Sequence, residues 1–132
     1  MKNTVLAAAL AGALGLVAAS NAFADVTAAI TALDPDTDGT VDLAEAQAGG
    51  AKLFTALDPD KDGTLDAKEL AGRLDEAGLK SADPDSDGTL DAKEYSAVIE
   101  KSFTAANPDT DGTVDAKELG TEAGQALLKL IQ

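Results

Sequence analysis

The stretch DPDTDGTVDLAE at residues 34–45 returns three more times along the chain, as DPDKDGTLDAKE at 58–69, DPDSDGTLDAKE at 83–94 and NPDTDGTVDAKE at 107–118. Such a repeat decides the architecture, because each copy is expected to form the same local structure. All four copies place Gly at position 6 and Glu at position 12, and Asn replaces the first Asp only in the fourth. An acidic linker would not fix a Glu six residues after every Gly.

The spacing is that of an EF-hand loop, in which oxygen atoms surround a cation. Side chains at positions 1, 3, 5 and 9 converge across a tight turn, position 7 offers its carbonyl, and Glu at position 12 adds two oxygens. We therefore predict the following metal ligands: Asp34, Asp36, Asp38, Thr40, Asp42 and Glu45; Asp58, Asp60, Asp62, Thr64, Asp66 and Glu69; Asp83, Asp85, Asp87, Thr89, Asp91 and Glu94; Asn107, Asp109, Asp111, Thr113, Asp115 and Glu118.

The donor atoms of these loops restrict the metal. The chain contains no Cys and no His, the ligands that zinc and copper sites use. Oxygen ligands favour hard cations. Because the loops supply enough ligands to fill a coordination sphere, and a metal-activated water needs an open position, we expect no enzymatic activity.

The segments between the loops are too short for two helices each. They span 46–57, 70–82 and 95–106, and twelve residues make only ~18 Å of helix. We expect an all-α, EF-hand-like fold: a compact fused array of about five short helices joined by four twelve-residue metal loops. Gly49 and Gly50 should interrupt the helix after the first loop. Apolar stripes with helical spacing mark the other helices: Val26, Ala29, Ile30 and Leu33; Leu70, Leu74 and Ala77; Tyr95, Val98, Ile99 and Phe103; Leu119, Ala123, Leu127 and Leu130.

Position 8 of every loop is apolar, and in EF-hands this residue packs against a partner loop. The four residues are Val41, Leu65, Leu90 and Val114. They are so alike that the sequence leaves open which loops pair.

Residues 1–24 resemble a secretory signal peptide. Lys2 precedes an apolar run, and Ala22-Phe23-Ala24 matches the small-x-small cleavage pattern. A membrane anchor is the alternative, since the uncharged run has sufficient length. We expect cleavage after Ala24, which gives a secreted single domain of residues 25–132 that is not attached to a membrane, and we expect this domain to be a monomer although the sequence does not determine its oligomeric state.

The charge of this expected mature chain restricts its partners. Loss of Lys2 leaves nine basic against 24 acidic residues, a formal net charge of −15. So acidic a chain is not expected to bind nucleic acid, which attracts basic surfaces. Metal ions are the expected partners, and the sequence identifies no protein partner.

Three features bear on the choice between calcium and a trivalent ion. Every loop has Pro at position 2. Every loop also has Asp at position 9, so loops 34–45, 58–69 and 83–94 each carry five carboxylates. A trivalent ion gains more Coulomb energy from them, but it also loses more hydration energy, so both metals remain possible. The chain after Met1 has no methionine, which disfavours a sensor with a Met-rich target groove.

The motif D-P-D-x-D-G-T-[VL]-D-x-x-E, the 12–13-residue spacing and the Asn that opens the fourth loop resemble the lanmodulin family of periplasmic EF-hand proteins in methylotrophic bacteria. The resemblance covers residues 25–132. It implies selective binding of lanthanide(III) ions, with calcium as a weaker competitor, and folding of a largely disordered chain when metal binds. It also implies strong sites at the loops that begin at Asp34, Asp58 and Asp83, a weaker site at Asn107, and a role in lanthanide uptake or trafficking. A periplasmic calcium buffer or sensor is the alternative.

Overall fold

The structure, a computed structural model, describes residues 24–132. The expected signal peptide, residues 1–24, lies outside the described residues except for Ala24. Within residues 24–132, no helix is both long enough and apolar enough to cross a membrane.

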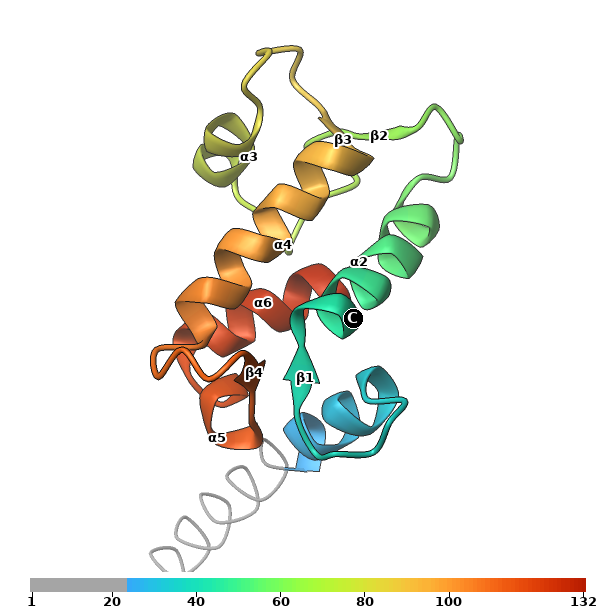
Figure 1. The fold of residues 1–132 in the computed structure, drawn as a ribbon. Helices are drawn as coiled ribbons and strands as arrows, with labels where there is room; N and C mark the ends of the chain where they lie inside the picture. Colours follow the sequence, from blue (N-terminus) through green and yellow to red (C-terminus); the bar gives the residue numbers. More distant parts are fainter. Residues whose placement is uncertain (1–23) are drawn as a thin grey trace, which may run out of the picture.

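Helices alternate with the four repeated loops, which we number 1 to 4 in chain order (Figure 1). Residues 24–33 are helical and lead into loop 1. The remaining elements are β1 (Val41–Asp42), α2 (Leu43–Leu57), β2 (Thr64–Leu65), α3 (Glu76–Ala82), β3 (Leu90–Asp91), α4 (Ala92–Ala106), β4 (Thr113–Val114), α5 (Ala116–Leu119) and α6 (Glu122–Ile131). The expected all-α fold of short helices joined by four loops is confirmed.

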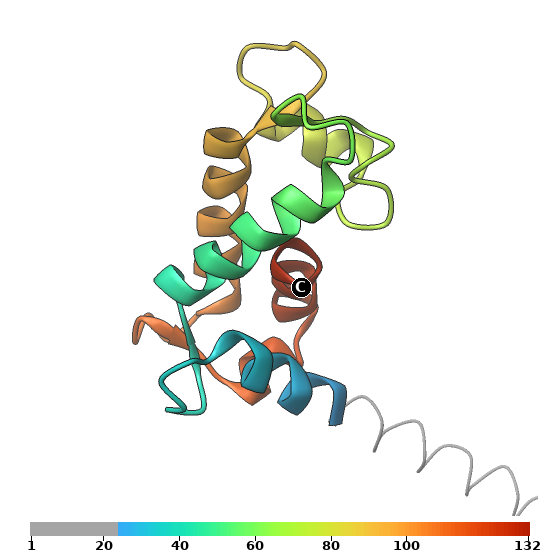
Figure 2. The ribbon, with the colours of Figure 1, turned by 90° about the vertical axis from the view of Figure 1, so that its right-hand side faces the viewer.

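The loops pair through two-residue strands at opposite ends of the molecule. Strand β1 of loop 1 pairs antiparallel with β4 of loop 4, and β2 of loop 2 pairs with β3 of loop 3. Helix α2 runs from the first pair to the second, and α4 returns, as both ribbon views show (Figures 1 and 2). The pairing therefore joins the first loop to the last and the two middle loops to each other.

The core lies between the two pairs, where α2, α4 and α6 pack against one another. Ile99 of α4 and Leu127 of α6 are buried within it. The position-8 residues extend the core into both loop pairs, since Val41 faces Val114 and Leu65 faces Leu90, and all four are 0% exposed. This confirms that the apolar residue of each loop packs against a partner loop.

The expected interruption at Gly49 and Gly50 is wrong, because α2 continues through both residues. A Cβ at Gly49 would lie 2.6 Å from Leu33 Cδ2 and 2.8 Å from the Ile131 carbonyl oxygen, and one at Gly50 would collide with the Ile99 side chain. These glycines let the preceding helix, α4 and α6 approach the backbone of α2. Close packing compensates for the lower helix propensity of glycine.

The segments 46–57 and 95–106 are single helices, as expected, but two other segments differ. After loop 2, residues 67–74 form turns instead of helix, and Gly72 has a φ of +80°. Asp75 then begins α3 by accepting a hydrogen bond from Gly78 N at 2.6 Å. After loop 4, the helix divides at Gly120, and Thr121 caps α6. The described residues thus contain six helices where the sequence predicted about five.

Candidate metal sites

The first residue of loops 1 to 3 is a buried carboxylate that organises the loop backbone. In loop 1, Asp34 accepts a hydrogen bond from Asp38 N at 3.2 Å and another from Gly39 N at 2.8 Å. Asp58 and Asp83 accept the equivalent pairs in loops 2 and 3. These bonds are possible because the chain turns sharply, with φ of +83° to +86° at the position-6 glycines of these three loops.

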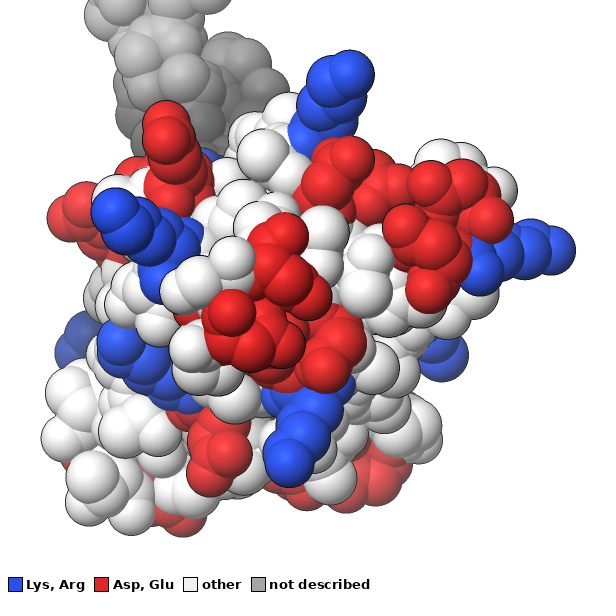
Figure 3. All heavy atoms as spheres, turned by 90° about the horizontal axis from the view of Figure 1, so that it is seen from above, with Lys and Arg blue, Asp and Glu red and all other residues white. Residues whose placement is uncertain are grey.

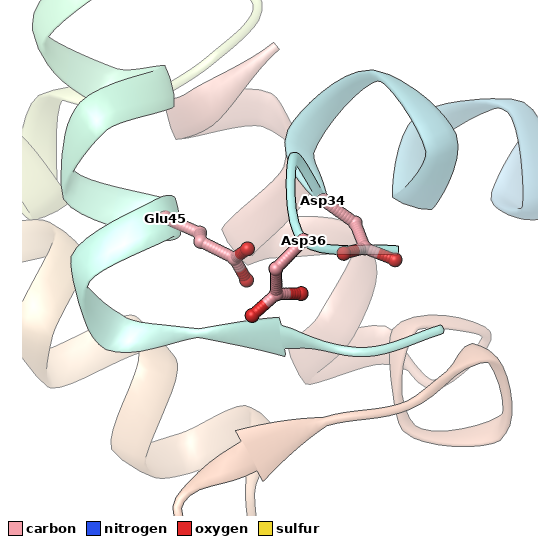
Figure 4. Close-up of side chains that lie close together, drawn as sticks. All are labelled: Asp34, Asp36 and Glu45. Carbon is pink, nitrogen blue, oxygen red and sulfur yellow. The ribbon is translucent and has the colours of Figure 1, made fainter. Parts of the chain in front are cut away.

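Carboxylates at positions 1, 3 and 12 come together in the same three loops. In loop 1, Asp34 and Asp36 precede β1, whereas Glu45 lies in the first turn of α2, and the three side chains point toward one another (Figure 4). One oxygen from each lies within 4.8 Å of the other two, and the same holds for Asp58, Asp60 and Glu69 and for Asp83, Asp85 and Glu94. The predicted ligands at positions 1, 3 and 12 therefore converge.

The carboxyl groups of each triad shift one another's pKa values. Burial raises the pKa of Asp34, but hydrogen bonds from Gly39 N and from the Asp36 side chain outweigh it and lower the pKa overall. The same hydrogen bond to Asp34 raises the pKa of Asp36. Equivalent opposite shifts occur in Asp58 and Asp60 and in Asp83 and Asp85. Burial also raises the pKa of Glu45. A bound cation would relieve this crowding of negative charge.

The carboxylate at position 5 accepts hydrogen bonds from the residue at position 7. Asp38 Oδ1 accepts hydrogen bonds from both the backbone N and the hydroxyl of Thr40, at 2.8 and 2.7 Å. The triads do not include this carboxylate. The sequence predicted only a carbonyl ligand at position 7 and missed the role of its hydroxyl, although Thr occupies that position in every loop.

The position-9 aspartates begin the helices that follow loops 1, 3 and 4, where they are N-caps. Asp42 Oδ1 accepts from Glu45 N at 2.8 Å, while Glu45 Oε2 accepts from Asp42 N at 2.9 Å. Asp66 and Glu69 form the same reciprocal bonds after loop 2. This arrangement is a capping box, and the D-x-x-E spacing signals it in the sequence. The structure thus assigns Asp42, Asp66, Asp91 and Asp115 a structural contact, and their metal ligation stays a prediction.

Loop 4 begins differently. Asn107 is 7% exposed, and its Oδ1 is the one buried side-chain polar atom in the described part of the chain that has no hydrogen-bond partner. A buried polar oxygen without a partner carries a free-energy cost, which a bound cation would remove. Asp109, Asp111 and Glu118 occupy the equivalent positions of this loop.

The two loop pairs place the candidate sites at opposite ends of the molecule, loops 1 and 4 at one end and loops 2 and 3 at the other. The end that carries loops 2 and 3 shows acidic side chains gathered in patches (Figure 3). The acidic patches and the carboxylate triads both offer oxygen ligands. The residues present therefore fit a hard cation.

Comparison with known proteins agrees with this geometry. A family model described as EF hand matches residues 51–72, a segment that encloses all of loop 2. No curated protein matches the chain. The match and the carboxylate triads together fit an EF-hand metal-binding protein, of a class that is typically not enzymatic. The fold is therefore a compact all-α EF-hand-like fold that carries metal-binding loops.

Proposed function

We propose that this chain binds trivalent lanthanide ions in the periplasm and folds when it does so. Loops 1, 2 and 3 provide the strong sites, and loop 4 provides a weaker one. The observation that carries the proposal is the convergence of three carboxylates within 4.8 Å in each of loops 1 to 3. Carboxylates held so close are mutually repulsive until a cation lies among them, and repulsion falls further with each unit of cation charge.

Metal-driven folding follows from the same crowding. The position-8 residues that extend the core belong to the loops themselves, so the loops must close before Leu65 can pack on Leu90. Loss of the metal would leave the acidic loops repelling one another, and the binding energy of the metal thus becomes folding energy. We also propose, from the resemblance of its loop motif, that the chain is a member of the lanmodulin family with a role in lanthanide uptake or trafficking.

Calcium binding is the second candidate, and one observation favours it. In every loop, Oδ1 of the position-9 aspartate accepts the backbone N–H of the position-12 Glu, so these carboxylates contribute less to the charge that faces the ion than a count of five carboxylates per loop implies. If they do not approach the metal, the electrostatic argument for a trivalent ion is weaker.

Titration of residues 25–132 with metal, followed by circular dichroism in a chelator-buffered solution, tests the proposal. We expect helical content to rise at a far lower free concentration of La(III) than of Ca(II). An equal response to both metals would reject selectivity, and no response to either would reject metal binding as the cause of folding.

A matched variant isolates the contribution of the position-9 aspartates to the preference for La(III) over Ca(II). The triple substitution Asp42→Ser, Asp66→Ser and Asp91→Ser removes three charges but keeps an oxygen that can cap a helix. We expect the triple variant to fold with metal and to show a smaller preference for La(III) over Ca(II). An unchanged preference would remove position 9 from the explanation of selectivity.

A further inference from the structure

The last turn of α6 accepts hydrogen bonds from two side chains that lie far away in the sequence. Arg73 Nη1 donates to the carbonyl oxygens of Lys129 and Gln132, at 2.8 and 2.7 Å. The Tyr95 hydroxyl donates to the Leu130 carbonyl oxygen between them. Carbonyls at the end of a helix have no N–H of that helix to accept from, so these donors replace the missing helical bonds. We call the three hydrogen bonds the α6 clamp.

Both donors of the α6 clamp follow closely on a metal loop. Tyr95 comes directly after Glu94, the last predicted ligand of loop 3. Arg73 lies four residues after Glu69, the last predicted ligand of loop 2. Leu70 is fully buried, and its carbonyl oxygen accepts the Arg73 N–H at 3.0 Å, which fixes the short segment between Glu69 and Arg73. The position of each donor therefore depends on how its loop closes.

The opposite end of α6 is attached to loop 4. The hydroxyl of Thr121 donates to the carbonyl oxygen of Glu118 at 2.6 Å and accepts from Gly124 N at 3.1 Å. Glu118 is the last predicted ligand of loop 4. A Cβ at Gly124 would collide with the Glu118 carbonyl oxygen, so this close approach depends on glycine. Both ribbon views show α6 running from α5 to a C-terminal end beside α2 (Figures 1 and 2).

The charge of Arg73 suits its place at this helix end. The C-terminal end of a helix carries partial negative charge, which a cation stabilises. Arg73 is the only arginine in the chain. Burial raises the pKa of Tyr95 to about 12, and the positive charge of Arg73 opposes that rise, as expected for two donors that lie close together. Without the α6 clamp, the last turn of α6 should be less ordered.

We propose that α6 transmits the metal occupancy of loops 2 and 3 to loop 4 through the α6 clamp. A cation in these two loops fixes Glu69 and Glu94, and with them the donors that follow. The clamp then orders α6, and an ordered α6 holds Glu118 in position for loop 4. Coupling between binding sites is reciprocal, so metal in loop 4 strengthens loops 2 and 3 by the same factor. This inference rests on the proposed function, namely that the loops bind cations.

The connection spans two ends of the molecule that share no strand pairing. Among the described residues, loop 4 pairs only with loop 1, and loops 2 and 3 pair only with each other. Helix α4 also leads from loop 3 to loop 4. A test must therefore separate transmission through α6 from transmission through α4.

A double-mutant cycle makes this separation, with the expected mature chain and La(III) as the probe ion. One change disables the metal sites of loops 2 and 3, through Glu69→Gln and Glu94→Gln. The other change removes the α6 clamp, through Arg73→Gln and Tyr95→Phe, which keeps the aromatic ring. Site-resolved NMR titration follows loop 4 through the amide signal of Gly112, its position-6 glycine.

The quantity measured is a coupling factor: the La(III) affinity of loop 4 with loops 2 and 3 intact, divided by its affinity with both disabled. We expect about fivefold in the original chain, at the lower end of typical couplings, and about one without the α6 clamp. A general loss of stability would lower both affinities and leave the factor unchanged. A factor of about one in the original chain would overturn the inference. A factor that the clamp variant leaves unchanged would also overturn it and would assign the coupling to α4.

The matched control is Lys80→Gln with Thr104→Val. Lys80 is an exposed lysine of α3, and the Thr104 hydroxyl donates to the Glu100 carbonyl oxygen within α4. The control removes one positive charge and one hydroxyl, as the clamp variant does, and should keep the coupling factor of the original chain. A control that lowers the factor as far as the clamp variant does would count against a specific role of the clamp.

Two further results keep the test decisive. If loop 4 takes up no La(III) while loops 2 and 3 are both disabled, the cycle is repeated with Glu69→Gln alone as the disabling change, and the same outcomes apply. If the amide signals of Gly63 and Gly88 do not respond to La(III) in the original chain, the proposed function itself fails. That result is distinct from an unchanged coupling factor.

Discussion

The hydroxyl of Tyr95 donates a 2.7 Å hydrogen bond to the backbone carbonyl of Leu130. Tyr95 is in the first turns of α4, directly after the last ligand of loop 3, and Leu130 is near the end of α6. Burial raises the pKa of Tyr95 to about 12, so the hydroxyl keeps its proton at neutral pH. The Phe54 ring meets Tyr95 edge-on, with 5.6 Å between the ring centroids. Tyr95 of α4 therefore contacts α2 through Phe54 and α6 through Leu130.

Replacing Tyr95 with Phe should lower the stability of the metal-loaded protein by about 1 kcal/mol, because the buried Leu130 carbonyl loses its donor while the ring packing is kept. Denaturant unfolding in saturating metal measures the change. Arg73 also donates hydrogen bonds to carbonyls at the end of α6, those of Lys129 and Gln132. Because these bonds are exposed, they should contribute less to stability, and Arg73→Gln is the comparison. A Phe variant as stable as the original chain would show that the hydrogen bond does not contribute.

Loop pairing predicts which metal sites influence each other. Leu65→Ala removes a fully buried side chain between loops 2 and 3 and should cost about 2–5 kcal/mol in the loaded state. Site-resolved NMR titration should show weaker binding in both of these loops and a smaller effect in loops 1 and 4. Val41→Ala is the reciprocal variant and should weaken loops 1 and 4 first. Equal losses at all four sites in both variants would contradict this coupling.

Gly49→Ala should destabilise the loaded protein even though Ala favours helix by about 1 kcal/mol. The new Cβ would lie 2.8 Å from the Ile131 carbonyl oxygen, which belongs to the backbone of α6 and cannot rotate away, and 2.6 Å from Leu33 Cδ2. Thermal unfolding in saturating metal measures the net effect. Ala51→Gly, at an exposed position of the same helix, reports the propensity contribution alone. Greater stability of Gly49→Ala would mean that α6 does not approach the backbone of α2 as closely as described.

Asn107→Asp should strengthen metal binding in loop 4. The substitution adds a negative charge and an oxygen that can accept the backbone N–H bonds that Asp34, Asp58 and Asp83 accept in the other loops. Before substitution, NMR titration should show loop 4 filling last, and the variant should move it toward the others. Loop 4 filling first in the original chain would refute the ranking of the sites.

The triads also predict how pH acts on the metal-free chain. The raised pKa of Asp36 means that its contribution to folding is fully present below its ordinary value of 3.8 and is lost as the pH rises through the raised value. The lowered pKa of Asp34 has the opposite effect, since its contribution is present above 3.8 and is lost as the pH falls through the lowered value. Both statements hold for the equivalent pairs in loops 2 and 3.

Helical content in chelator should therefore increase as the pH falls from neutral toward 3.8 and decrease at lower pH. Bound metal competes with the same protons, so the loaded protein should release metal in the window where the metal-free chain gains helix. Circular dichroism follows both changes. The triple variant Asp36→Asn, Asp60→Asn and Asp85→Asn is the control, and persistence of the acid-induced gain in it would assign the gain to other carboxylates.

The twelve-residue repeat was sufficient to predict the loops, the convergence of the ligands at positions 1, 3 and 12, and the helix at 95–106. It also predicted the burial of Val41, Leu65, Leu90 and Val114. The loops and the helix depend on contacts within one loop or one helical turn, so a local pattern of residue types specifies them. The burial at position 8 was predictable because the residue is apolar in every loop, although its partner was not. The capping role of Asp42 was also visible as a local D-x-x-E signal, but the metal-ligand interpretation of the same residue obscured it.

The sequence by itself determined that four oxygen-rich loops would alternate with short helices, because the side-chain hydrogen bonds that shape each loop lie within its own twelve residues. Only the tertiary structure decided that loop 1 pairs with loop 4, since Val and Leu at position 8 offer no chemical distinction between partners. It also decided that Gly50 continues a helix instead of ending one, because the reason is the approach of Ile99 from a distant part of the chain. Contacts within each loop determine the structure of that loop, and the packing of α2, α4 and α6 determines where the loops lie relative to one another.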